Sequence, residues 1–117
     1  LTGRLPYNAR TPAALLGEWA GQRPDDGTPL YLLGKNLHGE GRFREAAAYL
    51  DRALARSIAL PSLREEAWRV RLLAACAEGD LPAARRALAG FEALPTPSRA
   101  RRAGARAVAT RCGATSP

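Results

Sequence analysis

Apolar residues recur along this chain at the three- and four-residue spacing of amphipathic helices, and no stretch alternates as a half-buried strand does. This period predicts helices over about residues 13–21, 28–38, 42–56, 63–77, 81–94 and 99–111. Thr11-Pro12 and Thr28-Pro29 are typical helix beginnings, whereas Gly41 and Gly79 stand where helices are expected to end. The pattern therefore predicts an all-α fold of about six helices, preceded by an irregular lead-in over residues 1–10.

Two blocks of the chain, 38 positions apart, share one spacing of large apolar, small and turn residues. The first block holds Leu30, Leu33, Gly34, Leu37, Gly41, Phe43, Ala46 and Leu50; the second holds Trp68, Leu72, Ala75, Gly79, Leu81, Ala84 and Leu88. Turns as short as those at Gly41 and Gly79 require the flanking helices to be antiparallel neighbours. An internal repeat of this length is typical of stacked helical hairpins, which usually bind other macromolecules.

These residues resemble the tetratricopeptide repeat (TPR), a helix–turn–helix unit of about 34 residues. The motif is carried by Leu30-x2-Leu33-Gly34-x2-Leu37 followed by Ala46-x3-Leu50; the second block keeps Trp68 but departs from the pattern at Arg71 and Leu72. The resemblance implies a short right-handed α-solenoid in a single domain. Its expected parts are a lead-in and short packing helix (1–27), a first hairpin (28–60), a second hairpin (61–95) and an Arg-rich capping helix with a tail (96–117).

The resemblance also implies a concave groove lined by the first helix of each hairpin. The matching positions are Tyr31, Lys35 and His38, then Arg69, Leu73 and Cys76, with Arg102 and Arg106 continuing the surface. Such a basic set with apolar gaps would suit a protein or peptide partner with an acidic segment or a C-terminal carboxylate. The family's carboxylate clamp is not expected, because Asn36 does not fall on the groove side. A scaffold with an empty groove is the alternative.

The net charge of +7 is concentrated at one end, because residues 96–117 hold five arginines and no acid. A basic end of this kind predicts an anionic partner, either nucleic acid or an acidic surface, although a solubilising outer face explains it equally. The segment lacks the interleaved aromatic residues that stack on bases. A third hypothesis is self-association through an end of the stack, because the face around Val108 is thin.

Cys76 and Cys112, the two cysteines of the chain, are 36 positions apart, close to one repeat length. Both are expected near the ends of helices that run parallel in adjacent units, so they could form a disulfide. A bond would imply an oxidising compartment such as a bacterial periplasm; two unpaired thiols would leave the bacterial cytoplasm open.

Candidate chemistry is sparse in this sequence. His38 is the only histidine and is expected at a helix end, and we find no phosphate-binding loop, no paired metal ligands and no nucleophile motif. We therefore expect no enzyme, no cofactor and no metal. There is also no apolar run long enough to span a membrane. Because the chain begins at Leu1 and contains no Met, we expect it to be part of a longer protein, and its Ala/Arg-rich composition hints at a bacterial source.

Overall fold

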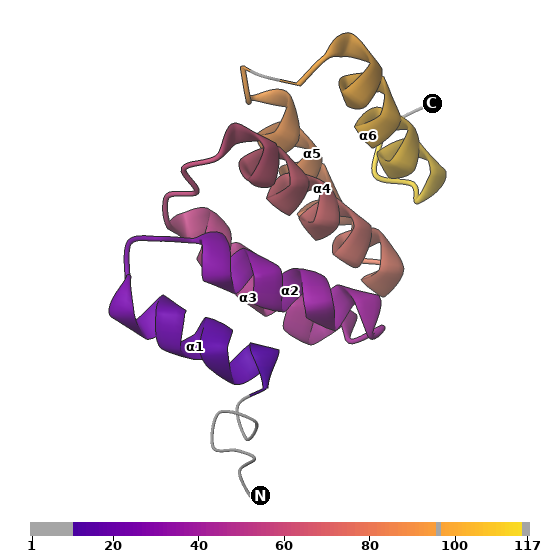
Figure 1. The fold of residues 1–117 in the computed structure, drawn as a ribbon. Coiled ribbons are helices and arrows are strands. Elements are labelled where there is room, and N and C mark those ends of the chain that lie inside the picture. Colours follow the sequence, from indigo (N-terminus) through magenta and orange to yellow (C-terminus); the bar gives the residue numbers. More distant parts are fainter. Residues whose placement is uncertain (1–10, 96, 116–117) are drawn as a thin grey trace, which may run out of the picture.

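The computed structural model describes residues 11–95 and 97–115, and within these ranges it forms six α-helices and no β-strand (Figure 1). The helices are α1 (Pro12–Gln22), α2 (Thr28–Gly39), α3 (Phe43–Ala55), α4 (Pro61–Glu78), α5 (Leu81–Glu92) and α6 (Arg99–Arg111). The predicted all-α class and helix number are confirmed. The irregular lead-in expected over residues 1–10 lies outside the described residues, as do residues 96, 116 and 117.

Most helix boundaries follow the capping signals of the sequence. At the beginning of α1, Thr11 Oγ1 accepts a hydrogen bond from the Ala14 N–H at 3.0 Å. At the beginning of α5, Asp80 Oδ1 accepts one from the Ala83 N–H at 3.1 Å. Helix α4 ends at Gly79, which has φ of 70°, a left-handed conformation that glycine adopts without a steric penalty. These caps satisfy backbone groups that a helix end leaves without partners.

Two helix beginnings differ from the prediction. Gly27 rather than Thr28 is the capping residue of α2, because the Asp26 carboxylate accepts the hydrogen bond of the Thr28 N–H at 2.9 Å. Helix α4 begins at Pro61, two residues before the expected position. A proline there is compatible with the helix because the first-turn N–H has no helical acceptor.

Each helix packs against the next one along the chain, from α1 and α2 through to α5 and α6. Helix α4 also contacts both α2 and α6. Helices α2, α4 and α6 therefore form one row, while α3 and α5 lie behind α2 and α4 in Figure 1. The short turns after Gly39 and Glu78 make α2 and α3, and likewise α4 and α5, antiparallel neighbours.

The core consists of two apolar clusters made largely of alanine and leucine. The first joins α1, α2, α3 and the beginning of α4, and its buried members are Ala20, Leu30, Tyr31, Leu33, Leu50, Ala53, Ile58, Ala67 and Val70. The second joins α4, α5 and α6 through Leu72, Ala75, Ala83, Ala84, Ala87, Leu88, Phe91, Ala105, Ala109 and Ala114. Helix α6 thus contributes small side chains to the second cluster.

Arg71, where the repeat pattern has leucine, adds a polar link between α4 and α3. Its side chain is 11% exposed and binds Asp51, with Nε 2.7 Å from Oδ1 and Nη2 3.3 Å from Oδ2. The paired geometry compensates the loss of hydration of a largely buried guanidinium. The departure from the pattern is therefore accommodated by an acidic residue on the neighbouring helix.

Gly34 allows α2 and α3 to approach closely. A Cβ atom at this position would lie 2.7 Å from Leu50 Cγ and 3.3 Å from the Ala46 carbonyl oxygen. This is the crossing at which the sequence pattern places two small residues, one on each helix. No side chain larger than hydrogen fits there unless Leu50 moves.

In the second antiparallel pair, α4 and α5, a different glycine allows the close approach of the two helices. Trp68 of α4 lies over Gly90 of α5, where an added Cβ would overlap the indole ring. Leu72 takes the position that the pattern reserves for a small residue, and it is fully buried in the cluster that also contains Ala84. The small residue of this pair is therefore supplied by the second helix rather than the first.

We predict that Gly34→Ala lowers the free energy of unfolding by about 1–3 kcal/mol, because overpacking at Leu50 forces the helices apart. Gly39→Ala is the matched control: it lies at the end of the same helix, and its added Cβ meets no atom within 4 Å. Urea denaturation followed by circular dichroism measures both variants. Equal stabilities for the two would show that the α2–α3 spacing does not depend on Gly34.

Candidate functional site

A groove that contains Arg69, one of the predicted site residues, lies between α4 and α6 and has a volume of about 540 Å³. It is lined by Ser62, Glu65, Glu66 and Arg69 from α4, Phe91 from α5, and Arg101, Gly104, Ala105 and Val108 from α6. Phe91 and Ala105 are buried and form an apolar floor with Val108. Its size falls within the range of about 300–1,000 Å³ usual for ligand sites.

Charged pairs of both signs flank this apolar floor. Arg69 binds Glu66 through two hydrogen bonds, from Nε to Oε1 at 2.6 Å and from Nη2 to Oε2 at 2.8 Å. The hydrogen bonds from Arg69 hold the pKa of Glu66 below its usual value, and the charge of Lys35 acts in the same direction. Across the groove, Arg101 of α6 lies 3.2 Å from Glu65 of α4. The groove is therefore close to electrically balanced rather than basic.

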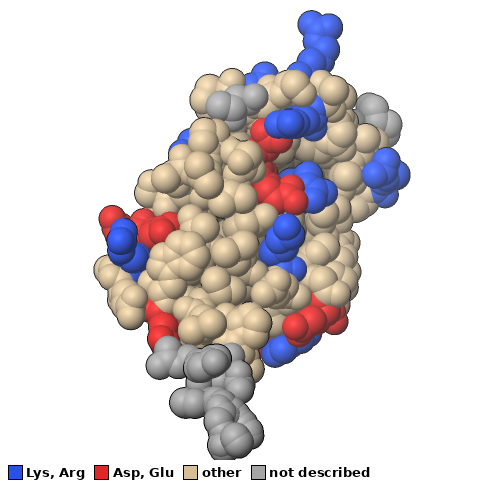
Figure 2. Space-filling model, in the orientation of Figure 1, with Lys and Arg blue, Asp and Glu red and all other residues tan. Residues whose placement is uncertain are grey.

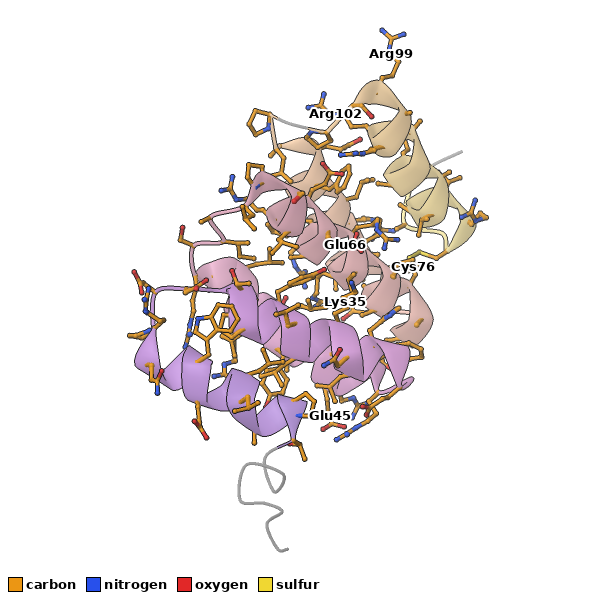
Figure 3. The ribbon with its side chains drawn as sticks, viewed as in Figure 1. Lys35, Glu45, Glu66, Cys76, Arg99 and Arg102 are labelled. Atoms are coloured by element: carbon orange, nitrogen blue, oxygen red, sulfur yellow. A yellow bond between two sulfur atoms is a disulfide. The ribbon has the colours of Figure 1, made fainter. Side chains whose placement is uncertain are left out.

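Figure 2 shows the same mixture on a larger scale, because basic and acidic side chains are interspersed on this face and form no continuous basic patch. Figure 3 shows Lys35 of α2 and Glu66 of α4 near the middle of the face, and Arg99 extending away from the beginning of α6. The ion pair between Arg101 of α6 and Glu65 of α4 lies on this face.

Tyr31 was expected in the groove, and the structure corrects this. Its side chain is only 1% exposed and belongs to the apolar cluster around α2 and α3. Burial raises the pKa of the Tyr31 hydroxyl to about 12, with a further contribution from the negative charge of Glu66. The hydroxyl is therefore buried and is not available to a partner.

Arg102 and Arg106 also do not continue the groove. Arg102 Nη2 donates a hydrogen bond to the Leu94 carbonyl oxygen at 2.8 Å, and Arg106 forms an ion pair with Glu92 at 2.8 Å. Both side chains therefore tie α6 to the end of α5. The groove is reached instead by Arg101, which sequence reasoning missed although it shares one helix face with Ala105 and Val108.

The other predicted groove residues occupy three different environments. His38 is half-buried at the end of α2, where its ring meets Phe43 edge-on with centroids 5.3 Å apart. Leu73 is half-buried on α4. Lys35 is exposed and reaches a different hollow of about 610 Å³ between α1, α2 and α3, which Tyr49 also lines. The structure therefore brings only Arg69 of the predicted set into the α4–α6 groove.

Glu45 and Arg42 stand at the rim of this second hollow, near the label Glu45 in Figure 3. Arg42 donates to Glu45 at 2.8 and 2.6 Å, and these hydrogen bonds lower the pKa of the Glu45 carboxyl. Both side chains are about half exposed, so the pair contributes little to stability. The hollow adjoins residue 11, where the described part of the chain begins, and we assign no function to it.

Cys76 and Cys112 lie together, and the structure has them as a disulfide with the two Cα atoms 5.5 Å apart. Cys76 belongs to the last turn of α4, and Cys112 caps the end of α6. Next to this link, Arg85 of α5 donates a hydrogen bond to the Ala114 carbonyl oxygen at 3.0 Å. The disulfide therefore fixes one end of the α6 wall of the groove.

The described residues contain no cluster of three His, Cys, Asp or Glu side chains able to hold a metal ion. Over the same residues, no helix has both the length and the apolar character needed to cross a membrane. Comparisons with protein-family models, curated proteins and solved structures give no significant match. The TPR resemblance therefore rests on the residues of the motif themselves.

Tyr31 gives a testable dependence on alkaline pH. The unfolded chain releases the phenol proton near its usual pKa of 10.0, whereas the folded chain retains it to about 12. The stabilisation is therefore complete below pH 10 and is lost as the pH rises towards 12. We predict that the free energy of unfolding falls less steeply over this interval in Tyr31→Phe than in the wild type.

Urea denaturation at pH values between 10 and 12 measures this difference. Tyr49→Phe, on the half-buried face of α3, is the matched control and should retain the alkaline loss of the wild type. If Tyr31→Phe loses stability as steeply as Tyr49→Phe, the buried hydroxyl is not the source of the effect.

Proposed function

We propose that this chain is a TPR-like protein–protein interaction module, which holds a segment of a protein partner on the row formed by α2, α4 and α6. In this proposal the antiparallel pairs stack as a short right-handed α-solenoid, with α1 and α6 as its ends. The observation that carries the proposal is the α4–α6 groove, because it combines an apolar floor with charged rims and an open side.

The charges of the groove favour recognition through its floor. Arg69 and Arg101 are already paired with Glu66 and Glu65, so an acidic segment would have to compete with these carboxylates. An apolar side chain of the partner, by contrast, would lie against Val108, above the buried Phe91 and Ala105, and would not compete with these carboxylates. We therefore propose that an apolar anchor supplies most of the affinity, and that an acidic neighbour is secondary.

Binding to nucleic acid or another anionic surface through α6 is the less favoured function. Three of the five arginines of this helix are engaged within the molecule: Arg101 by Glu65, Arg102 by the Leu94 carbonyl, and Arg106 by Glu92. Among the described residues, this leaves Arg99 and Arg111 at opposite ends of α6 without an acidic partner. Two separated charges release few counterions from a phosphate backbone and would give weak binding.

Self-association through α1, at the end of the molecule opposite α6, is a second candidate. On α1, Leu15 is 49% exposed and Trp19 is 37% exposed, although both are large apolar side chains. An exposed apolar helix at the end of a helical stack would favour contact with another helix. A concentration-dependent mass in solution that is abolished by Leu15→Glu would support this candidate.

The disulfide supports an oxidising compartment, and we propose a bacterial periplasm as the most consistent location. We propose no catalytic activity, because the lone histidine contacts Phe43 rather than a nucleophile or an acid. The chain would then act by binding alone, as one part of a longer bacterial protein.

The groove is tested by filling it. Gly104 lines the groove, and an added Cβ there meets no atom within 4 Å, so Gly104→Gln places a long side chain in the open space without a clash. We predict that this variant captures at least about tenfold less partner in a pull-down from a bacterial extract, because one lost apolar anchor costs that much affinity. Helix stability should rise slightly, because glutamine is a better helix former than glycine.

Gly17→Gln is the matched control, because Gly17 is also inside a helix with open space around it but lies on α1, outside the groove. The eluate is analysed for both protein and nucleic acid at low and at moderate salt. A protein that survives moderate salt and is lost only with Gly104→Gln supports the proposal. Equal capture by both variants, or nucleic acid retained only at low salt, contradicts it.

A further inference from the structure

The contacts that hold α6 differ in kind from those within the rest of the molecule. The side chains that α6 buries are Ala105 and Ala109, with Val108 half-buried, and directly after the helix Ala114 is buried and Cys112 packs against the same cluster. Two alanines bury little apolar area compared with the leucines and aromatic residues that join the other helices. The apolar contribution to holding α6 in place is therefore small.

The polar ties of α6 are also weak individually. In the ion pairs of Arg101 with Glu65 and Arg106 with Glu92, the arginine side chains are 64% and 57% exposed. Exposed ion pairs of this kind contribute little to stability because water and salt screen them. Arg102 and Arg85 add hydrogen bonds to the Leu94 and Ala114 carbonyl oxygens.

The chain segment that connects α5 to α6 does not extend either helix. Pro95 and Pro97 stand between the two helices, and a proline neither donates the backbone hydrogen bond of a helix nor allows the preceding residue to remain helical. Residues 94, 95, 97 and 98 between the two helices are not helical, so α6 does not continue α5. The Cys76–Cys112 disulfide is its one covalent link to α4.

We propose that α6 is a redox-sensitive wall of the groove, which docks on α4 and α5 when Cys76 and Cys112 are bonded and is released when they are reduced. In the reduction, a thiolate of a dithiol reductant attacks one sulfur and breaks the sulfur–sulfur bond, forming a mixed disulfide. The second thiol of the reductant then resolves this intermediate. Two electrons and two protons are transferred, so that Cys76 and Cys112 become thiols and the reductant leaves as its own disulfide.

The remaining helices have contacts that do not involve α6. The first apolar cluster, which includes Leu30 and Leu50, contains no residue of α6. In the second cluster, Leu72 and Leu88 join α4 to α5, and Trp68 covers Gly90 at the same interface. Reduction should therefore release α6 while α1 to α5 stay folded.

Release would remove the α6 side of the groove and uncover Phe91, which is only 1% exposed when α6 is docked. A partner segment held between α4 and α6 would then lose one of its two walls. This consequence rests on the proposed function, whereas the release of α6 does not.

Hydrogen exchange read by mass spectrometry, on the full chain with and without dithiothreitol, tests the release. After reduction, amides of residues 99–111 should exchange at least about tenfold faster, because the disulfide no longer tethers the end of α6 and so no longer restricts its local opening. Amides of α2 and α3 should exchange at unchanged rates. Trypsin provides a second readout, because α6 carries five arginines and should be cut rapidly only in the reduced protein.

Two variants separate the disulfide from the other ties. Cys76→Ser with Cys112→Ser should expose α6 in both conditions and show no response to dithiothreitol. Arg101→Gln with Arg106→Gln should leave α6 protected as long as the disulfide is intact. Unchanged protection of α6 after reduction would overturn the proposal, and so would loss of protection in α2 and α3 together with α6, which would make the disulfide a general staple of the fold.

The binding consequence is measured separately, by repeating the pull-down with reduced and oxidised protein. Loss of a groove partner on reduction, together with fast exchange in α6, supports both the redox-dependent release of α6 and the proposed binding in the groove. If α6 is released but neither form captures a partner, the redox-dependent release of α6 is supported and the proposed function fails.

Discussion

Helices α2 and α3 meet at Gly34, where a Cβ would lie 2.7 Å from Leu50, and the rest of the packing follows from this short separation. A chain with 25 alanines and seven aromatic residues has few large side chains with which to fill space between helices. Its helices must therefore approach closely in order to exclude water and to gain dispersion contacts. Gly90 under Trp68 meets the same requirement in the second pair.

The same constraint explains why the two ends of the molecule differ from its middle. In the middle, α3 and α4 each pack against helices on two sides, and the Arg71–Asp51 pair adds a polar link between them. At one end, α1 leaves Leu15 and Trp19 partly exposed. At the other end, α6 offers small side chains to its neighbours, so a disulfide and hydrogen bonds to carbonyl oxygens do what apolar packing does elsewhere. Redox sensitivity would then be a consequence of an alanine-rich end helix.

The sequence predicted local structure well because the determinants of local structure are themselves local. Helix period, the Thr11 and Asp80 caps and the left-handed glycine at Gly79 act within a few residues of one another. The closeness of Cys76 and Cys112 is one of the two alternatives that the sequence leaves open, because it depends only on two helices running parallel one repeat apart. The stacking of the hairpins as a solenoid stays a prediction.

The candidate site was harder to predict because it depends on helix rotation and on partners distant in sequence. Tyr31 matched a groove position in the motif, but the structure places its side chain in the core. Arg71 occupied a position expected to be apolar, and its partner Asp51 lies on another helix, so no local pattern identifies the pair. Arg101 could have been recognised as the groove residue of α6 from its spacing to Ala105, but only once the buried face of that helix was known.

The arginines show why the formal net charge alone is a poor guide to the surface that this protein presents. The formal charge of +7 suggests an anionic partner, yet Arg69, Arg101 and Arg106 each lie against a glutamate of the same or a neighbouring helix. A guanidinium paired in this way keeps its donors oriented but presents little net field to a distant anion. What remains on the α4–α6 face is an apolar floor between balanced pairs. Under the proposed function, that combination would favour a partner that offers shape and apolar area over one that offers charge.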